Sequence, residues 1–241
     1  MKYLHIHALF FPILWVGLYL DSHFFAQQWL TNILVFITFI WLYTQVSKQI
    51  KQLMLYGLIV ALGGEYLFSL VFGMYTYRLE NLPIYVPFGH AIIYACVYYF
   101  IKEPIILKHQ KLIIKFLYVA MIIYSSAWLI FGNDVFGFIC LLVIIWVFKR
   151  RPQTKLFFFF MFFAIVYLEL IGTYYQCWYW PEVWFDKVSF IPSANPPSAI
   201  SVFYFGFDAG CLWFYKRFNP TKWQRFKRLR TLKSNSFSQK N

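Results

Sequence analysis

Two glutamates, Glu65 and Glu169, each lie inside an apolar segment that is long enough to cross a lipid bilayer. A carboxylate in hydrocarbon costs about 2.5 kcal/mol or more on insertion scales, so such residues are candidates for function. A carboxyl group in an apolar setting can also donate a proton near neutral pH. We therefore predict that both glutamates are catalytic. The alternative interpretation is a protonated carboxyl group that hydrogen-bonds a neighbouring helix.

Each glutamate is followed by a pair of aromatic residues at alternate positions. Tyr75 and Tyr77 follow Glu65, and Trp178 and Trp180 follow Glu169. Aromatic faces stabilise cations, and an acid that protonates an alkene needs such a lining, because the carbocation it forms has no counter-ion in hydrocarbon. These four residues are predicted to bind substrate. An ordinary aromatic belt at the outer membrane interface would explain them as well.

Three further polar residues are candidates for the same site. His90, at the outer start of an apolar segment, is well placed to meet Glu65 and is predicted to relay protons. Asn195 and Asp208 are predicted to contact substrate; turn formation and helix packing are their alternatives. Since no HxxxH or ExxH spacing supplies two ligands from one helix, we predict no metal. The chain has no nucleotide-binding signature, so no redox cofactor is predicted.

Composition places the chain among polytopic helical membrane proteins. Of 241 residues, 61% are hydrophobic and only 13% are charged, whereas soluble folds contain about 25% charged residues. We predict an all-α transmembrane bundle of about eight helices that forms one domain over residues 1–215, followed by a basic tail over 216–241. The predicted apolar segments are 3–20, 30–46, 53–72, 83–101, 112–131, 135–148, 156–174 and 197–215.

The distribution of positive charge predicts the orientation of these segments. Lys2, Lys48, Lys102 and Lys149 all fall on one side of the bundle together with the tail, which places both termini in the cytoplasm. The expected location is the cell membrane, specifically a bacterial inner membrane. The net charge of +13 is concentrated in the tail, where nine of the 22 basic residues lie from Lys216 onward. Such a tail is expected to bind an anionic membrane surface and not nucleic acid.

This topology makes the segments of the two glutamates parallel. Glu65 lies about twelve residues into its segment and Glu169 about thirteen, so both are expected in the outer half of the bilayer. Each has a hydroxyl residue one turn further out, Ser69 and Thr173, on the same helix face. A parallel repeat of four plus four helices would explain these coincidences. The aromatic, proline-rich stretch 176–197 is predicted to fold back as a cap over the outer end.

The residues around the two glutamates resemble the integral-membrane carotenoid hydratase family, which includes the bisanhydrobacterioruberin and carotene 1,2-hydratases. The resemblance consists of a glutamate with a Phe-Gly-x-Tyr-x-Tyr element, and an acidic residue with a Trp-x-Trp and a Pro/Asn approach to a helix. Here they read Glu65 with Phe72-Gly-Met-Tyr-Thr-Tyr77 and Leu82-Pro-Ile-Tyr-Val-Pro87, then Glu169 with Trp178-Tyr-Trp180 and Ile191-Pro-Ser-Ala-Asn195. The resemblance implies acid-catalysed addition of water to a terminal carbon–carbon double bond, a lyase reaction.

Three hypotheses about function follow from the sequence. The leading one is an enzyme acting on an isoprenoid or other lipid, in which one glutamate donates a proton and the other orients or deprotonates water. The second is a small proton-coupled transporter or flippase that binds its solute through Glu65, Glu169 and Asp208. The third is a non-catalytic assembly subunit, in which both glutamates would tolerate substitution by glutamine.

Overall fold

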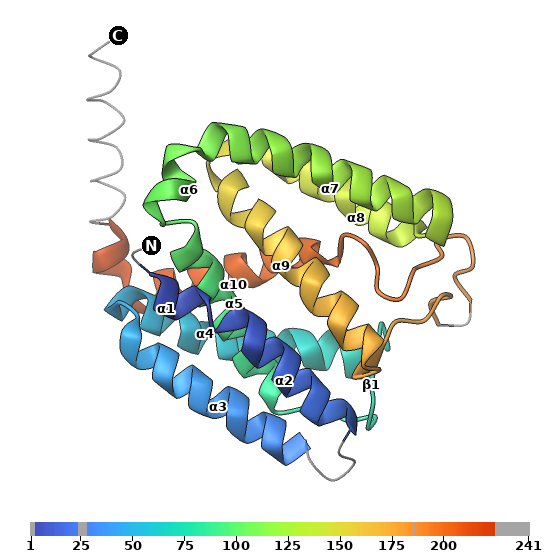
Figure 1. Cartoon of the computed structure of the whole chain (residues 1–241), viewed down its shortest axis with the longest axis horizontal. Helices are drawn as coiled ribbons and strands as arrows, with labels where there is room; N and C mark the ends of the chain where they lie inside the picture. Colours follow the sequence, from blue (N-terminus) through green and yellow to red (C-terminus); the bar gives the residue numbers. More distant parts are fainter. Residues whose placement is uncertain (1–2, 24–27, 186, 225–241) are drawn as a thin grey trace.

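The computed structural model describes residues 3–23, 28–185 and 187–224, and regular structure in these ranges is almost entirely helical (Figure 1). The long helices are α2 (Phe10–His23), α3 (Gln28–Gln45), α4 (Lys48–Glu65), α5 (Tyr85–Phe100), α7 (Gln110–Gly132), α8 (Val135–Arg150), α9 (Lys155–Tyr174) and α10 (Phe203–Phe218). The short elements are α1 (Leu4–His7), α6 (Pro104–Lys108), the π-helix η1 (Tyr66–Val71), the 3₁₀ turns η2 (Pro152–Thr154) and η3 (Ile200–Val202), and the strands β1 (Thr76–Tyr77) and β2 (Trp178–Tyr179). The all-α prediction is confirmed.

Each of the eight predicted apolar segments overlaps one of the long helices. The described chain contains four stretches that are long and apolar enough to cross a membrane, as expected of a membrane protein. They are Leu4–His23, Lys48–Val71, Gln110–Gly132 and Pro152–Tyr174. The last helix, α10, runs past residue 215 to Phe218, so the first residues of the predicted basic tail are helical. Residues 225–241, which make up most of that tail, lie outside the described ranges.

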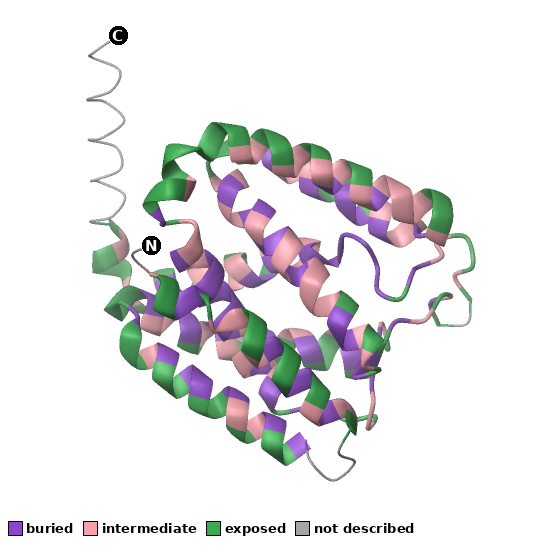
Figure 2. Cartoon of the chain, in the orientation of Figure 1, coloured by how far each residue is buried: buried purple, intermediate pink, exposed green. Residues whose placement is uncertain are grey.

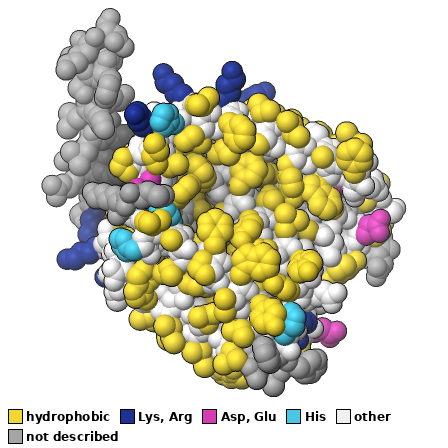
Figure 3. Space-filling model, in the orientation of Figure 1, with side chains coloured by type: hydrophobic (Ala, Val, Ile, Leu, Met, Phe, Trp, Pro, Cys, Tyr) yellow, Lys and Arg dark blue, Asp and Glu magenta, His cyan; other side chains and the backbone are white. Residues whose placement is uncertain are grey.

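The outer surface of the bundle is apolar, as expected for helices that face lipid. Exposed residues recur along α7 and α3 (Figure 2), and hydrophobic side chains cover much of the visible face (Figure 3). On α7 the exposed positions include Phe116 and Phe131, whose side chains are 69% and 89% exposed. Large exposed apolar surfaces mark contact with a membrane or with another protein. The few basic residues on α7, Lys111 and Lys115, lie in its first two turns.

Helix α5 lies at the centre of the bundle and contacts α1, α2, α3, α4 and α9. Ala91 and Ala95 on this helix are fully buried, because their small side chains let neighbouring helices approach closely. A helix enclosed on so many sides has little freedom to shift. His90, the residue before Ala91, is therefore held by a rigid element.

The helix that carries Glu65 changes its hydrogen-bond pattern immediately after that residue. Helix α4 ends at Glu65 and continues as the π-helix η1 from Tyr66 to Val71. A π-helical turn holds an extra residue and occurs most often at functional sites. Gly73, with a φ of 58°, then turns the chain back toward the bundle, which a residue without a side chain does at little cost.

A two-stranded antiparallel sheet joins the two aromatic pairs that the sequence placed far apart. Thr76 pairs with Tyr179, and Tyr77 pairs with Trp178. Figure 1 shows β1 beside the end of α9. Because side chains alternate between the two faces of a strand, Tyr75 and Tyr77 point inward with Trp178 and Trp180. The outward residues Thr76 and Tyr179 are exposed, whereas the four inward ones are buried.

Two buried aspartates fasten the outer loops to the helices. Asp21, at the end of α2, accepts hydrogen bonds from Arg78 Nη2 at 3.0 Å and from the Tyr85 hydroxyl at 2.8 Å. Asp134, between α7 and α8, accepts from the backbone N–H groups of Gly137, Ala194 and Ser198. Both carboxylates are fully buried. The stretch 176–197 accordingly folds back against the start of α8, as the predicted cap requires; Asp186 within it lies outside the described ranges.

Candidate active site

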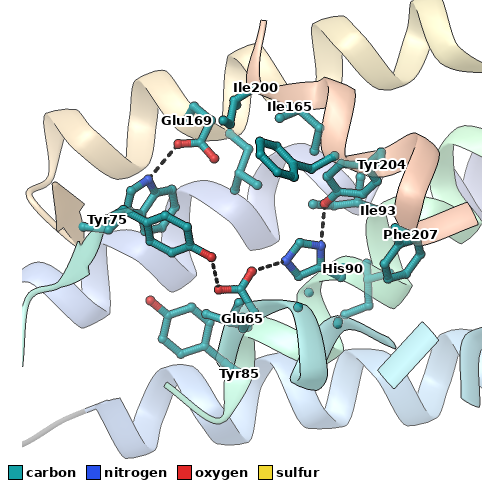
Figure 4. Close-up of a pocket in the computed structure, with 18 of the residues that line it drawn as sticks. Glu65, Tyr75, Tyr85, His90, Ile93, Ile165, Glu169, Ile200, Tyr204 and Phe207 are labelled. Carbon is teal, nitrogen blue, oxygen red and sulfur yellow. Dashed lines mark hydrogen bonds and ion pairs between the residues drawn. The ribbon is translucent and has the colours of Figure 1, made fainter. Parts of the chain in front are cut away.

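A cavity of about 560 Å³ lies between α2, α3, α4, α5, α9 and α10, within the roughly 300–1,000 Å³ typical of ligand pockets. Most of its lining is apolar or aromatic, and the charged or titratable exceptions include Glu65, Glu169 and His90. Figure 4 shows these three side chains around the cavity, with Tyr75 between the two glutamates. The structure therefore brings together the three residues that the sequence predicted to be catalytic.

Glu65 is held by three side-chain hydrogen bonds. Its Oε2 accepts from the hydroxyl groups of Tyr75 at 2.5 Å and Tyr77 at 2.6 Å. Its Oε1 lies 2.8 Å from Nε2 of His90. Tyr77 in β1 and Tyr75 immediately before that strand supply the phenols, and the first turns of α5 supply the imidazole. A carboxyl group with this many hydrogen-bond partners is fixed in position.

Burial and the charge of Glu65 act together on the two phenols. Burial first, and then the neighbouring Glu65 carboxylate, raises the pKa of the Tyr75 and Tyr77 hydroxyl groups above their ordinary value of 10.0. Both phenols therefore stay protonated at physiological pH. They act as hydrogen-bond donors to Glu65 and not as bases.

His90 connects Glu65 to Tyr204 on α10. The Tyr204 hydroxyl lies 2.7 Å from Nδ1 of His90, and the two rings stack with centroids 5.3 Å apart. If Tyr204 donates to Nδ1, the neutral imidazole carries its proton on Nε2 and donates it to Glu65. Tyr204 was not among the sequence predictions. A tyrosine in an aromatic segment gives no signal of its own, and only the packing of α10 on α4 brings it to His90.

Glu169 is bound through one carboxyl oxygen only. Its Oε2 accepts hydrogen bonds from the indole N–H groups of Trp178 at 2.8 Å and Trp180 at 3.0 Å. Among the described residues no hydrogen-bond partner is found for its Oε1, although Glu169 lines the cavity. Oε1 is thus the oxygen from which a proton could be given to a molecule in the cavity.

The two glutamate sites have the same construction. Each carboxylate receives two hydrogen bonds on one oxygen from aromatic residues two positions apart on a short strand. The strands pair, and their rings meet across the sheet, with centroid distances of 4.5 Å between Tyr75 and Trp180 and 6.2 Å between Tyr77 and Trp178. The predicted substrate-binding aromatics are thus also the hydrogen-bond donors of the glutamates, so they orient the carboxyl groups and line the cavity at once.

Two predicted substrate contacts do not line the cavity. Asn195 accepts a hydrogen bond from the backbone N–H of Trp180 at 3.0 Å, so it positions that indole instead of touching ligand. Asp208 accepts from the Tyr94 hydroxyl at 2.8 Å. It lies one helical turn beyond Tyr204, and the buried ring of Phe207 separates this level from His90. The structure therefore places Asp208 in a helix–helix contact with Tyr94 and not in the lining of the cavity.

The hydroxyl groups predicted to share a face with the glutamates bond to the backbone instead. Ser69 donates to the carbonyl of Tyr75 at 3.2 Å, and Thr173 donates to the carbonyl of Glu169 at 2.8 Å. Ser69 thereby helps to position the chain at the start of β1, and Thr173 gives its hydrogen bond to a carbonyl of its own helix, α9. Within the described ranges no group of three or more His, Cys, Asp or Glu side chains could hold a metal ion.

Gly172 is required for the position of Trp178, and its substitution tests the Glu169 site. A Cβ atom added at Gly172 would lie 2.0 Å from Cζ2 of Trp178. The Gly172→Ala variant should therefore displace the indole and lower the unfolding free energy by about 1–3 kcal/mol, the usual cost of overpacking. Denaturant titration in detergent micelles measures this change. Gly63→Ala is the matched control, because a Cβ there meets no atom within 4 Å; equal stability of the two variants would contradict the prediction.

The chain matches no protein-family model, no curated protein and no solved structure. The resemblance to carotenoid hydratases accordingly stays a prediction from two short motifs. Function has to be argued from the site itself.

Proposed function

We propose that the protein is an integral-membrane enzyme of a bacterial inner membrane that adds water to a carbon–carbon double bond of an isoprenoid or similar lipid. The observation that carries this proposal is the unpaired Oε1 of Glu169, which faces an apolar, aromatic cavity opposite the fully hydrogen-bonded Glu65. Two carboxyl groups in such different surroundings are suited to opposite roles, one as acid and one as base.

In the first step Glu169 donates the proton on Oε1 to the terminal carbon of the double bond. The π electrons form the new C–H bond, and positive charge develops on the adjacent carbon. The faces of Trp178, Trp180 and Tyr75 can stabilise this charge, since all three line the cavity. The indole N–H groups remain on Oε2 and stabilise the carboxylate that the step leaves behind.

In the second step water adds to the cationic carbon through its oxygen, and Glu65 accepts the proton that the water loses. His90 and Tyr204 hold Glu65 and can carry the proton onward, because the three groups form a continuous hydrogen-bonded chain. Return of that proton to Glu169 completes the cycle. The balance is one alkene and one water for one alcohol, with no change of oxidation state that would need a redox cofactor.

We infer further that the chain crosses the membrane about eight times as two parallel halves of four helices, with both termini in the cytoplasm. Four long helices lie outside the four membrane-length stretches described above, namely α3, α5, α8 and α10. Each has 16 to 18 residues, which corresponds to about 24–27 Å of helix. The symmetry of the glutamate sites supports this arrangement. Equivalent strands that pair antiparallel, with Thr76 opposite Tyr179, are what a twofold axis between the halves would produce.

The spacing within the two halves differs by one residue, and η1 accounts for the difference. Tyr75 follows Glu65 by 10 positions, whereas Trp178 follows Glu169 by 9. The π-helical turn between Glu65 and β1 absorbs the additional residue, so that both strands arrive in register. We take this as further support for descent of the two halves from one repeated unit.

Comparative lipid mass spectrometry of cells with and without the protein tests the proposed activity. We expect a lipid that gains the mass of one water only when the protein is present. An identical lipid profile in both strains would overturn the hydratase proposal. If the lipid profiles are identical and proteoliposomes that contain the protein take up an unaltered solute in response to a proton gradient, the transporter hypothesis would be favoured instead.

A further inference from the structure

The packing of α10 on α4 changes abruptly along the length of the two helices. Toward the cytoplasm they are in close contact: a Cβ on Gly57 would lie 3.1 Å from the Phe207 ring, and one on Gly210 would lie 3.0 Å from Val60. The two helices run antiparallel, since Tyr56 in the first half of α4 stacks on Phe214 near the end of α10, whereas Phe68 meets Phe203 at the start of α10. Glycine is needed at both positions to permit this approach.

One helical turn beyond Val60 and Gly210, each helix carries a second glycine, Gly64 on α4 and Gly206 on α10. A Cβ on Gly64 would meet only the Phe68 ring, at 4.0 Å, and one on Gly206 would meet no atom within 4 Å. Both glycines line the cavity, yet Gly206 is exposed on the surface and Gly64 is partly exposed. At this level, therefore, neither glycine contributes a side chain to the wall between the cavity and the outside of the bundle.

Aromatic side chains close the gap on its outer side. Phe68 and Phe203 meet with ring centroids 4.7 Å apart. Four residues separate Gly64 from Phe68, which corresponds to about 6 Å along the helix axis. Because the carbon atoms of a hydrocarbon chain need about 4 Å to each neighbour, a single chain passes here only when the Phe68 and Phe203 rings turn aside, and a bulky headgroup is excluded.

The surroundings of the gap indicate that it faces hydrocarbon. Leu62 and Tyr66, which precede and follow Gly64 by two residues, are 53% and 58% exposed. Both belong to the stretch Lys48–Val71, which is long and apolar enough to cross a membrane. Directly behind the gap lie Glu65 on one helix and Tyr204 on the other, so a chain that passes through it reaches the hydrogen-bonded carboxylate.

We infer that Gly64 and Gly206 form a lateral window through which a single apolar lipid chain passes from the bilayer into the cavity, with Phe68 and Phe203 as its outer edge. The inference rests on the proposed function only in taking a lipid to be the ligand. It adds the route of access and the class of ligand, a lipid with a single apolar chain such as a polyprenyl group.

Time-resolved photolabelling of the full-length protein in lipid nanodiscs tests the window without any need for turnover. The probe is geranylgeraniol that carries a photoreactive diazirine at its chain end, and labelled peptides are located by mass spectrometry. In the wild type we expect label on cavity residues. Gly64→Leu and Gly206→Leu should each lower the initial labelling rate at least tenfold, because their side chains fill the window from opposite helices.

Gly63→Leu is the matched control and should label at the wild-type rate. Gly63 neighbours Gly64 in the same helix, and an added Cβ there meets no atom within 4 Å, but Gly63 does not line the cavity. Phe68→Ala removes one edge and should raise the rate, a result that misfolding would not produce. Wild-type rates in both glycine variants, or absence of cavity label in the wild type, would overturn the inference. If labelling depends on the window but the lipid profile is the same with and without the protein, the hydratase proposal is rejected and the window inference stands.

Discussion

Replacing Glu169 by glutamine is expected to lower formation of the hydrated lipid by about 10²–10⁴-fold, the usual contribution of a general acid. The amide oxygen of glutamine can still accept the indole N–H groups of Trp178 and Trp180, so the side chain keeps its place. What it loses is an acidic proton on the atom that replaces Oε1. The rate of product formation, measured by lipid mass spectrometry in cells expressing each variant at equal level, reports this loss.

The companion substitution tests the opposite role. Glu65→Gln should also abolish measurable product, because an amide accepts no proton from water and its NH₂ group would face the His90 nitrogen or the two phenols. Glu80→Gln is the control; Glu80 is exposed in the outer loop and does not line the cavity. Product formation at the wild-type rate by either Glu65→Gln or Glu169→Gln would remove that glutamate from the mechanism.

The helices and the principal site residues could be predicted because their causes are local. Long apolar segments form helices in a membrane whatever their neighbours are, and each predicted segment overlaps a long helix. Glu65, Glu169 and His90 stand out because polar groups are costly in such segments. Their depth follows from counting residues along the helix, and the cavity does contain all three.

The remaining features depend on contacts between distant parts of the chain. The strand pairing of Thr76 with Tyr179 joins segments that are far apart in the chain, and two-residue strands leave no periodic pattern in a sequence. The role of Tyr204 depends on how α10 crosses α4, which the sequence does not specify. In the sequence Asp208 looks like the two glutamates, because it too is a carboxyl group in an apolar helix. Only its contact with Tyr94 in the structure distinguishes a packing role from a place in the cavity.

Asp134→Ala is expected to lower the unfolding free energy by about 3 kcal/mol or more, because three buried N–H groups lose their acceptor at about 1 kcal/mol or more each. The Asp134 carboxylate accepts from Gly137 and Ala194 at 3.0 and 3.1 Å through Oδ1, and from Ser198 at 2.7 Å through Oδ2. The first of these bonds caps α8, and the other two hold the stretch that carries Asn195. Denaturant titration in detergent micelles measures the stability.

The same variant should weaken the active site at a distance. Ala194, held by Asp134, precedes Asn195, which accepts the backbone N–H of Trp180, and the Trp180 indole in turn donates to Glu169. Loss of the first contact should therefore speed proteolysis of the stretch 176–197 and reduce product formation together. Asp134→Asn should fall between wild type and Asp134→Ala, because one amide oxygen replaces only one of the two carboxylate oxygens. Glu182→Ala is the control, because Glu182 is exposed on the same stretch. Equal proteolysis of Asp134→Ala and Glu182→Ala would show that Asp134 does not hold this stretch.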